Sequence, residues 1–224
     1  MVKVLELFAG SRSIGKAAES LGYKVYSSDL NEFEGIDYPT DILDFDTTKV
    51  PFKPDIIWAS PPCTTYSIAA ISHHRPHNKP LSDFAIKSDN MVKKTISIIK
   101  ELNPKYWYIE NPRGMLRKQS FMQKLTRTTV WYCTYGDKRA KPTDIWTNNL
   151  RSVFNPNGWQ PRPECFNGNK NCHHESAPRG SRTGTQGLKG NYERSKIPNE
   201  LCLEILKLLF YYLNTHIDLA YYIF

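Results

Sequence analysis

A cysteine at the end of a predicted buried strand is the most reactive group that the sequence places where a ligand can bind. Cys63 follows the apolar run 55–59 and the two prolines Pro61 and Pro62. Ligands of open α/β sheets bind at the carboxyl ends of the strands, and a thiolate there can attack an electron-poor ring carbon near neutral pH. A lone cysteine is more often a small buried thiol. The paired prolines and the position after a strand favour a nucleophile here.

A carboxylic acid ends the next predicted strand. Glu110 and Asn111 follow the apolar run 106–109, so Glu110 is expected at the same sheet edge as Cys63. An acid that burial keeps protonated can hydrogen-bond or protonate a ring nitrogen while a thiolate attacks the ring. The structural alternative is an ion pair at the strand end, with Arg113 as the partner. Because both strand ends carry a reactive group, we interpret the pair as nucleophile and acid.

The turn after the first predicted strand is suited to a nucleotide-like ligand. Residues 8–15 include Gly10 and small side chains and lead into a predicted helix, so the backbone can approach a ligand at a helix N-terminus. Asp29 ends the second predicted strand about 20 residues later, where a carboxylate accepts hydrogen bonds from ribose hydroxyls. The alternative is a tight turn relieved by Gly10, with Asp29 as a cap. The motifs further along the chain favour the ligand site.

These groups require a parallel sheet to bring them together, and the pattern of the chain predicts one. Short apolar runs alternate with helical patterns, which indicates βαβ units and a doubly wound α/β fold. A final helix near Pro198 is expected to cover the sheet, because proline suits the first turn of a helix. The predicted strands are 2–8, 24–28, 40–43, 55–59, 106–109, 129–132 and 144–147, and the earlier helices are 14–21, 83–102 and a weak one at 121–125.

Length and composition predict one globular domain with a small insertion. The 224 residues, 40% of them hydrophobic, suffice for one well-filled core over residues 1–224. Gly, Pro, Asn, Ser and Cys dominate residues 148–194, which predicts a loop-rich insertion that takes part in substrate recognition. The net charge of +8 favours a polyanionic partner, because lysine and arginine release phosphate counterions when they bind one.

The sequence further predicts a cytoplasmic protein without a membrane segment. It opens on a strand-like stretch and lacks the charged and then apolar pattern of a signal peptide. Charged residues interrupt the most apolar stretch, 201–224, which therefore predicts a packed helix and a tail. Five cysteines, an odd number, fit a reducing compartment better than a disulfide framework.

Taken in order, the motifs resemble those of the cytosine-5 DNA methyltransferases, especially their short forms without a large target-recognition domain. That family has a Phe-x-Gly motif for the cofactor, a Pro-Cys motif followed by an aromatic residue and Ser, and a Glu-Asn motif. The resemblance runs from Val4 to about Ile205. The matching residues are Phe8 and Gly10, then Pro62, Cys63, Tyr66 and Ser67, and then Glu110 and Asn111.

The resemblance implies a Rossmann-like methyltransferase fold and transfer of a methyl group from S-adenosylmethionine to carbon 5 of cytosine in DNA. Cys63 would attack carbon 6 of a cytosine swung out of the duplex, while Glu110 assists at ring nitrogen 3. Asp29 would hold the ribose and Asp41 the adenine amino group. The cofactor residues implied in this way are Phe8, Ala9, Gly10, Ser11, Asp29, Leu30, Asp41, Ile42, Pro61 and Ile197.

The sequence departs from the family pattern at three places, one of them Arg194-Ser195, which replaces the usual Gly-Asn before Ile197. Arg12 stands where the family usually has a second glycine. The family's Gln-x-Arg-x-Arg pattern after Tyr-Gly is not kept, and which of Lys138, Arg139 and Lys141 grips the base and backbone stays open. We take Arg139 as the candidate catalytic residue.

Two alternatives to a DNA methyltransferase remain at this point. An enzyme that methylates cytosine in RNA would carry the same catalytic residues, and the short insertion offers no helix to read a DNA groove. A catalytically silent protein that binds nucleic acid or cofactor would keep the fold. The intact Cys63 and Glu110 argue against it, whereas Arg12 and the altered basic motif keep it in consideration.

Cysteine and histidine in the insertion predict a zinc site. Cys165, Cys172 and His173, together with Cys133 upstream, supply three thiols and an imidazole for tetrahedral coordination, which would organise a polar loop. The spacing between Cys165 and Cys172 is wider than in the usual zinc knuckle. The alternative is a set of unpaired cysteines in a flexible loop.

Basic residues outside these motifs are candidates for contact with phosphates. The run 73–79 follows the Cys63 turn and is expected to be a mobile loop that touches phosphates or has no role. A second group extends the basic surface or consists of ordinary exposed charges. Its members are Arg113, Arg117, Lys118, Lys124 and Arg127.

Overall fold

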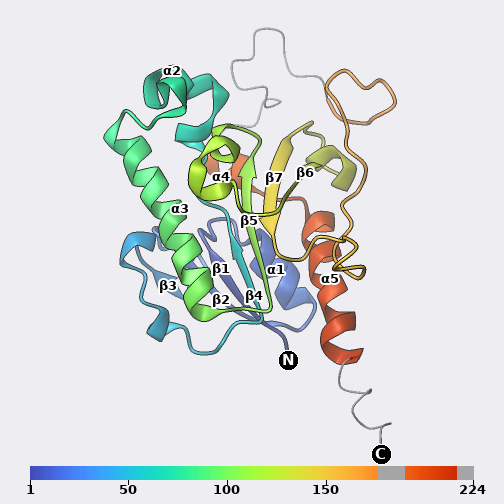
Figure 1. The fold of residues 1–224 in the computed structure, drawn as a ribbon. Helices are drawn as coiled ribbons and strands as arrows, with labels where there is room; N and C mark the ends of the chain where they lie inside the picture. The colour runs from blue at the N-terminus through green and yellow to red at the C-terminus, as the bar shows by residue number, and fades with distance from the viewer. Residues whose placement is uncertain (176–189, 216–224) are drawn as a thin grey trace, which may run out of the picture.

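Seven strands form one sheet in the computed structural model, which describes residues 1–175 and 190–215 (Figure 1). The strand order is β3-β2-β1-β4-β5-β7-β6. The strands are β1 (Lys3–Leu7), β2 (Lys24–Asp29), β3 (Tyr38–Pro39), β4 (Ile56–Ala59), β5 (Tyr106–Pro112), β6 (Arg127–Trp131) and β7 (Pro142–Thr147). The predicted doubly wound α/β arrangement is confirmed.

The direction of each strand decides which loops meet at one edge. Strands β1 to β5 are parallel, with Leu7 opposite Ala59 and Ala59 opposite Ile109. The segments that follow β1, β4 and β5 therefore leave the sheet at the same edge. Strand β7 runs antiparallel to β5 and places Ile145 opposite Glu110. Its beginning, rather than its end, reaches this edge, so the basic segment before Pro142 lies near Glu110.

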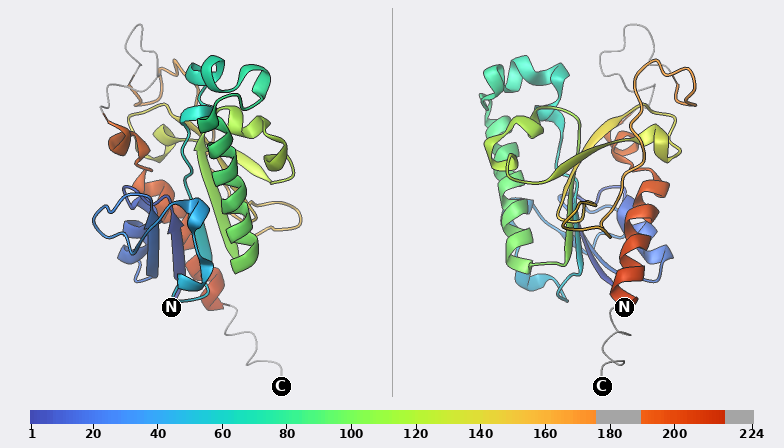
Figure 2. Two further views of the ribbon diagram at one scale, coloured as in Figure 1. Left: turned by 90° about the vertical axis from the view of Figure 1, so that its left-hand side faces the viewer. Right: turned by 45° about the vertical axis from the view of Figure 1, so that its right-hand side comes forward.

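Helices cover both faces of the sheet (Figure 2). Side chains alternate between the faces along each strand, so that Trp58 and Tyr108 belong to one core and Ile57 and Ile109 to the other. The first core packs under α1 and α5, and the second packs under α3. The helices are α1 (Ser13–Ser20), α2 (Ile71–His74), α3 (Asp83–Leu102), α4 (Asn191–Ser195) and α5 (Asn199–Thr215).

Local signals explain the length of α3. The Ser82 hydroxyl accepts a hydrogen bond from the Ala85 N–H at the start of the helix, and Asp83 lies in the first turn. Asn103 adopts a left-handed conformation with φ of 44° directly after the last turn, which ends the helix. These signals are local to the sequence, and the prediction of a helix at 83–102 is confirmed.

A buried glutamate, which the sequence did not single out, joins β1 to α1. Glu6 is only 3% exposed, and its two carboxylate oxygens accept hydrogen bonds from the N–H groups of Ile14 (3.1 Å) and Gly15 (3.0 Å). A Cβ atom at Gly15 would lie 2.7 Å from the Glu6 carboxylate, so glycine is required there. Glu6 thus sets the direction of the helix that begins at the first turn.

Two predicted elements differ from the observed ones. The third strand is β3 (Tyr38–Pro39), whereas Ile42–Asp44 forms a 3₁₀ turn because the Asp41 carboxylate accepts the Leu43 N–H. The helix predicted at 121–125 is absent from this described part of the chain. Two 3₁₀ turns, Met115–Lys118 and Ser120–Met122, stand before β6 instead.

Much of the predicted insertion at 148–194 can be followed in the structure. Residues 148–175 contain isolated bridges such as Leu150 with Trp159, and α4 lies near the end of the insertion. Residues 176–189 and the predicted tail from residue 216 lie outside the described residues. None of the helices within the described ranges has the length and apolarity needed to cross a membrane.

Burial of Glu6 should make the fold less stable as the pH rises. Burial raises the pKa of Glu6 from 4.5 to about 7, and the N–H groups of Gly15 and Ile14 oppose it only in part. Between pH 4.5 and 7 the folded chain therefore holds a proton that the unfolded chain has lost. The free energy of unfolding then decreases by about 3 kcal/mol through this window and is level above it.

Chemical unfolding of the wild type and of Glu6→Gln at a series of pH values checks this expectation. Glutamine carries no titratable group, so the difference in unfolding free energy between the two proteins should follow the Glu6 titration alone. A difference that does not change with pH would show that Glu6 has no raised pKa.

Candidate active site

The turn that carries Cys63 is held to the neighbouring strand. Cys63 precedes a 3₁₀ turn, Thr64–Tyr66, and its carbonyl accepts the Tyr66 N–H at 3.0 Å. The side-chain amide of Asn111, in β5, donates to the carbonyl of Pro61 at 2.8 Å. Asn111 directly follows Glu110, so this hydrogen bond brings the two predicted reactive groups to one place.

Glu110 is buried and has a fixed partner. It is 5% exposed, and its Oε1 accepts a hydrogen bond from the Tyr132 hydroxyl at 2.9 Å. Tyr132 is fully buried, and burial raises its pKa well above 10.0, so the hydroxyl stays protonated as a donor. No sequence motif marks Tyr132, because it lies in the turn Tyr132–Tyr135 after β6, two strands away from Glu110 in the sheet.

Lys141 supplies a positive charge beside Cys63 and Glu110. Its Nζ lies 4.6 Å from the centroid of the Tyr132 ring and donates to the carbonyl of Arg194 at 3.2 Å. The pKa of Lys141 is lowered, mainly by burial, while the charge of Glu110 opposes this shift. The pairing of the start of β7 with the end of β5, together with the Asn111–Pro61 hydrogen bond, thus brings a thiol, an acid and a cation to one edge of the sheet.

The Cys63 thiol is protonated at rest. Burial raises its pKa above 9.0, the nearby Glu110 charge raises it further, and the Lys141 charge lowers it. A thiol is a poor nucleophile, so attack requires a shift of this balance toward the thiolate. The two neighbouring charges act in opposite directions and therefore control the reactivity of Cys63.

Arg139, predicted to grip the base, is bound within the protein, with its guanidinium 5.6 Å from the centroid of the Tyr132 ring. It is 6% exposed, forms an ion pair with Asp137, and donates to the carbonyls of Arg194 (3.2 Å) and Lys196 (3.0 Å). These bonds join the start of β7 to the segment before α5. The role predicted for Arg139 stays a prediction, and Lys141, from the set that the sequence left open, is a second candidate because its Nζ lies beside the Tyr132 ring.

Part of the run 73–79, expected to be a mobile loop, is instead anchored in the core. The Arg75 side chain is 0% exposed and donates to the carbonyl of Thr65 (2.9 Å) and to Asp89 (2.7 Å). Its guanidinium lies 4.1 Å from the centroid of the Tyr66 ring, and the Tyr66 hydroxyl donates to the same Asp89. Arg75 thus fixes the turn after Cys63 against α3 and is unavailable for phosphates.

The predicted cofactor turn has the backbone of a ligand cradle. Phe8, Gly10 and Arg12 have positive φ values of 56°, 41° and 53°, so the chain curls tightly around this point. The N–H of Gly10 donates to Asp29 at 3.0 Å, which joins the turn to the end of β2. Ala9 and Ser11 are buried in the same turn.

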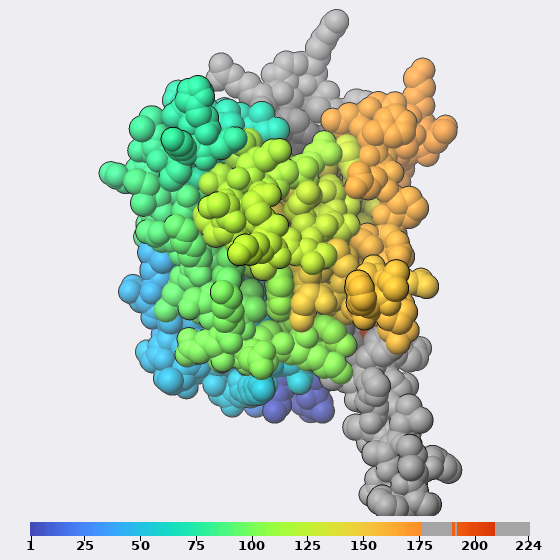
Figure 3. Space-filling model, viewed as in Figure 1, coloured from blue at the N-terminus to red at the C-terminus, as the bar shows by residue number. Residues whose placement is uncertain are grey.

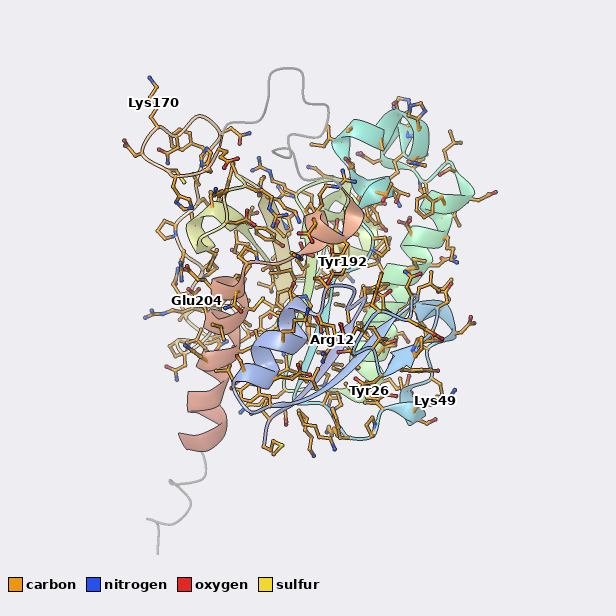
Figure 4. The ribbon with its side chains drawn as sticks, turned by 180° about the vertical axis from the view of Figure 1, so that it is seen from behind. Arg12, Tyr26, Lys49, Lys170, Tyr192 and Glu204 are labelled. Atoms are coloured by element: carbon orange, nitrogen blue, oxygen red, sulfur yellow. The ribbon has the colours of Figure 1, made fainter. Side chains whose placement is uncertain are left out.

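Arg12 replaces glycine without filling the cradle. Its Nε donates to the Ser27 hydroxyl at 3.2 Å, and its guanidinium pairs with Glu19 of α1 (Figure 4). A Cβ atom at Gly35 would lie 2.7 Å from the Arg12 guanidinium, so the side chain packs along the loop after β2. The departure from the family pattern is therefore accommodated on the protein side of the turn.

The remaining predicted cofactor residues surround this turn. The Thr40 N–H donates to the Asp29 carbonyl at 2.8 Å, which places Asp41 beside the end of β2. The carboxylate of Asp41 also pairs with Lys87 at 2.8 Å, and this bond is the main cause of its lowered pKa. Two carboxylates at adjacent strand ends fit the hydroxyl and amino groups of an adenosine. Leu30 is exposed, whereas Ile42, Pro61 and Ile197 are buried.

The segment before α5 closes one side of the turn. The N–H of Ile197 donates to the Ser13 hydroxyl at 3.1 Å. The Tyr192 ring of α4 lies 5.9 Å from that of Phe33, in the loop after β2. The predicted role of Ile197 near the cofactor is consistent with this position, and Tyr192 and Phe33 are additional candidates that no sequence motif revealed.

Three of the four predicted zinc ligands come together, and the neighbouring histidine completes the group in place of the predicted one. Ligand atoms of Cys133, Cys165, Cys172 and His174 all lie within 4.8 Å of one another. His173 instead places its Nε2 3.2 Å from the carbonyl of Asp137. The histidine of the cluster is therefore His174 rather than His173. Spacing alone could not separate two adjacent histidines.

Comparison with known proteins places the chain in a family. The model of the C-5 cytosine-specific DNA methylases matches residues 2–129. A Frog virus 3 (isolate Goorha) protein named "Probable DNA (cytosine-5)-methyltransferase" is 29% identical over 226 residues, covering 92% of this chain and 100% of that protein.

Solved structures share the fold at low sequence identity. A DNA modification methyltransferase encoded within an E. coli prophage has a TM-score of 0.51 at 17% identity, over 89% of this chain and 66% of that one. A methyltransferase of Entamoeba histolytica has a TM-score of 0.51 at 15% identity, over 74% of this chain and 58% of that one. The match of the family model covers more than half of the chain and includes both Cys63 and Glu110, and the chain therefore belongs to the C-5 cytosine-specific DNA methylase family.

Proposed function

We propose that this chain methylates carbon 5 of cytosine in DNA with S-adenosylmethionine as the methyl donor and Cys63 as the nucleophile. The observation that carries the proposal is the meeting of Cys63, Glu110 and Lys141 at the sheet edge where the cofactor turn also lies. Membership of the DNA methylase family supports DNA as the substrate. The intact pair of nucleophile and acid argues against a silent binding protein.

In this proposal the chain's own residues activate the base. The Cys63 thiolate forms a bond to carbon 6 of the cytosine, and Glu110 holds a proton at ring nitrogen 3, so the electrons of the attack are delocalised through the ring to carbon 5. Lys141 stabilises the thiolate and the negative charge that develops on the base. Once carbon 5 carries the methyl group, its proton passes to water and the bond to sulfur breaks, which restores the Cys63 thiolate.

The residues around the first turn are the proposed cofactor site. Backbone groups of Phe8 to Ser11 line the turn, and Asp29 and Asp41 stand at the ends of β2 and β3 for the ribose and the adenine. S-adenosylmethionine supplies, when bound, the electrophilic methyl group that carbon 5 takes up.

Cytosine with fluorine at carbon 5 tests the proposal directly. It accepts the thiolate and the methyl group but has no proton to lose, so the wild type should remain joined to a fluorinated duplex oligonucleotide. Mass spectrometry should find one protein, one oligonucleotide and, when S-adenosylmethionine is present, one methyl group. Glu110→Gln should slow adduct formation by about 10²-fold.

Two cysteine variants and one RNA complete this experiment. Cys63→Ala should form no adduct, whereas Cys202→Ala, which removes another buried thiol from the core under α5, should form it normally. Methylation of cytosine by Cys63→Ala would show that the nucleophile is misassigned. An adduct with fluorinated RNA and none with fluorinated DNA would replace the proposed substrate by RNA.

The reactivity of Cys63 should follow the two neighbouring charges. Lys141→Met removes the charge that lowers the Cys63 pKa, so alkylation of Cys63 by iodoacetamide at pH 8 should slow down. Glu110→Gln removes a charge that raises this pKa, so alkylation should accelerate. The alkylated Cys63 peptide is quantified by mass spectrometry. Lys138→Met, at an exposed lysine of the same segment, is the control and should resemble the wild type.

We further propose that the cysteine and histidine cluster binds one structural zinc ion. Three thiols and one imidazole in a compact group are a donor set that zinc prefers. Cys133 lies in the turn after β6, and the other three donors lie in the insertion, so the metal would join the insertion to the sheet. Thiol ligands must stay reduced, which supports a reducing, intracellular location.

The adjacent histidines provide a matched test of the zinc site. Protein purified without added metal should contain about one zinc ion per chain, and His174→Ala should lose most of it, because a ligand is removed. His173→Ala should retain it. Elemental analysis of the purified variants measures the metal content. Equal zinc content in the two variants, or zinc-free active wild type, would contradict the proposed site.

A further inference from the structure

A groove beside the Cys63 turn is lined on its two sides by different segments of the chain. Its volume is about 570 Å³, and it lies between residues 77–80 and residues 118–121, with α3 as its floor. The face with α3 and residues 118–121 is turned toward the viewer in Figure 3. The residues that matter for its charge are Lys79, Asp89, Lys93 and Lys118.

Buried ion pairs support both walls. On one side Arg75 pairs with Asp89 and fixes the chain that leads to residues 77–80. On the other side Arg117, next to Lys118, pairs with Asp144, which is 0% exposed on β7. Arg117 and Arg127 were expected to extend the basic surface, but both guanidinium groups are bound to Asp144. These ion pairs therefore fix the segments that carry the lysines.

The groove carries positive charge that the protein does not neutralise. Its one carboxylate, Asp89, is already bound to Arg75 and to the Tyr66 hydroxyl. Within residues 1–175 and 190–215, no carboxylate pairs with Lys79, Lys93 or Lys118. The Lys93 Nζ lies 5.3 Å from the centroid of the Phe121 ring, and this cation–π contact holds the ammonium at the groove without neutralising its charge.

The position of the groove indicates which anion it meets. Asp89 on the floor of the groove is bound to Tyr66 of the Cys63 turn, and residues 118–121 follow β5, the strand that carries Glu110. A base swung out of a duplex into the site keeps the phosphates on both sides of it close to this edge. Lysine binds phosphate as a point charge and reads no base.

We propose that Lys79, Lys93 and Lys118 bind the phosphate backbone of the DNA substrate beside the target cytosine. The proposal rests on the proposed function, because it takes DNA as the substrate. These contacts supply affinity and position without sequence specificity. Because the insertion of this chain is short, the lysine contacts supply part of the affinity for the duplex.

A second groove offers a matched control at the opposite edge of the sheet. It also has a volume of about 570 Å³ and is lined by Lys3, Lys53 and Lys105 together with Asp55. Lys3 begins β1, Asp55 precedes β4 and Lys105 precedes β5, so this groove lies at the amino ends of the parallel strands. Three Lys→Ala changes there remove the same charge, far from Cys63.

Binding of a duplex containing one target cytosine, measured by fluorescence anisotropy at several salt concentrations, tests the proposal. Each phosphate contact contributes about 0.9 to the slope of log K against log salt, so the triple variant Lys79→Ala, Lys93→Ala, Lys118→Ala should reduce this slope by about 2 to 3. Its affinity near 0.15 M salt should fall roughly tenfold or more. The Lys3, Lys53, Lys105 triple variant should keep a slope near that of the wild type.

The outcomes separate this proposal from the proposed function. Adduct formation with fluorinated DNA should proceed at the wild-type rate in the Lys3, Lys53, Lys105 variant, because that groove lies at the amino ends of the parallel strands, away from Cys63. Equal salt slopes for the two triple variants would contradict the proposed phosphate contacts. Lost affinity for RNA with unchanged affinity for DNA would also contradict them. The single variant Lys118→Gln should reduce the slope by about 1 and guards against misfolding of the triple variant. A wild type that forms no adduct would contradict the proposed function, whereas the salt slopes would still test the phosphate contacts of the groove lysines.

Discussion

The hydrogen bond from the Asn111 side chain to the carbonyl of Pro61 is the contact on which the arrangement of the site depends. It is buried, and it joins the turn before Cys63 to the residue after Glu110. A buried polar group that loses its partner costs about 1–3 kcal/mol, so the two reactive strand ends are held in register by more than the sheet. Arg75 extends this effect, because it fixes the turn after Cys63 to α3.

The reversed direction of β7 brings a positive charge to this arrangement. If β7 were parallel to β5, its amino end would lie at the far edge, and the basic segment before it would be remote from Cys63. Because β7 is antiparallel, Lys141 stands at the beginning of the strand next to the end of β5. The Tyr132 ring, between Lys141 and the Glu110 carboxylate, then links the cation and the acid through one side chain.

The sequence predicted those features that a strand end or a local cap determines. Cys63 and Glu110 were identified because each follows an apolar strand, and α3 was predicted because its caps are local. The same local signals do not predict the direction in which a side chain points within the fold. Arg139 and Lys141 look equivalent in sequence, and only the contact with Asp137 shows that Arg139 is already bound. His173 and His174 differ in the same way, and Arg75 appeared to be one more exposed cation until its burial was known.

The balance of charges around Cys63 couples the nucleophile to the acid. While Glu110 is ionised, its charge raises the pKa of the Cys63 thiol and holds it in the unreactive form. In the proposed reaction Glu110 shares a proton with ring nitrogen 3, which weakens that influence, whereas Lys141 continues to favour the thiolate. The proposed contact of Glu110 with ring nitrogen 3 would therefore also favour loss of the Cys63 proton. Burial strengthens both effects, because charges interact more strongly away from water. The proposed mechanism thus links attack on the ring to protonation of the ring through the charges that surround Cys63.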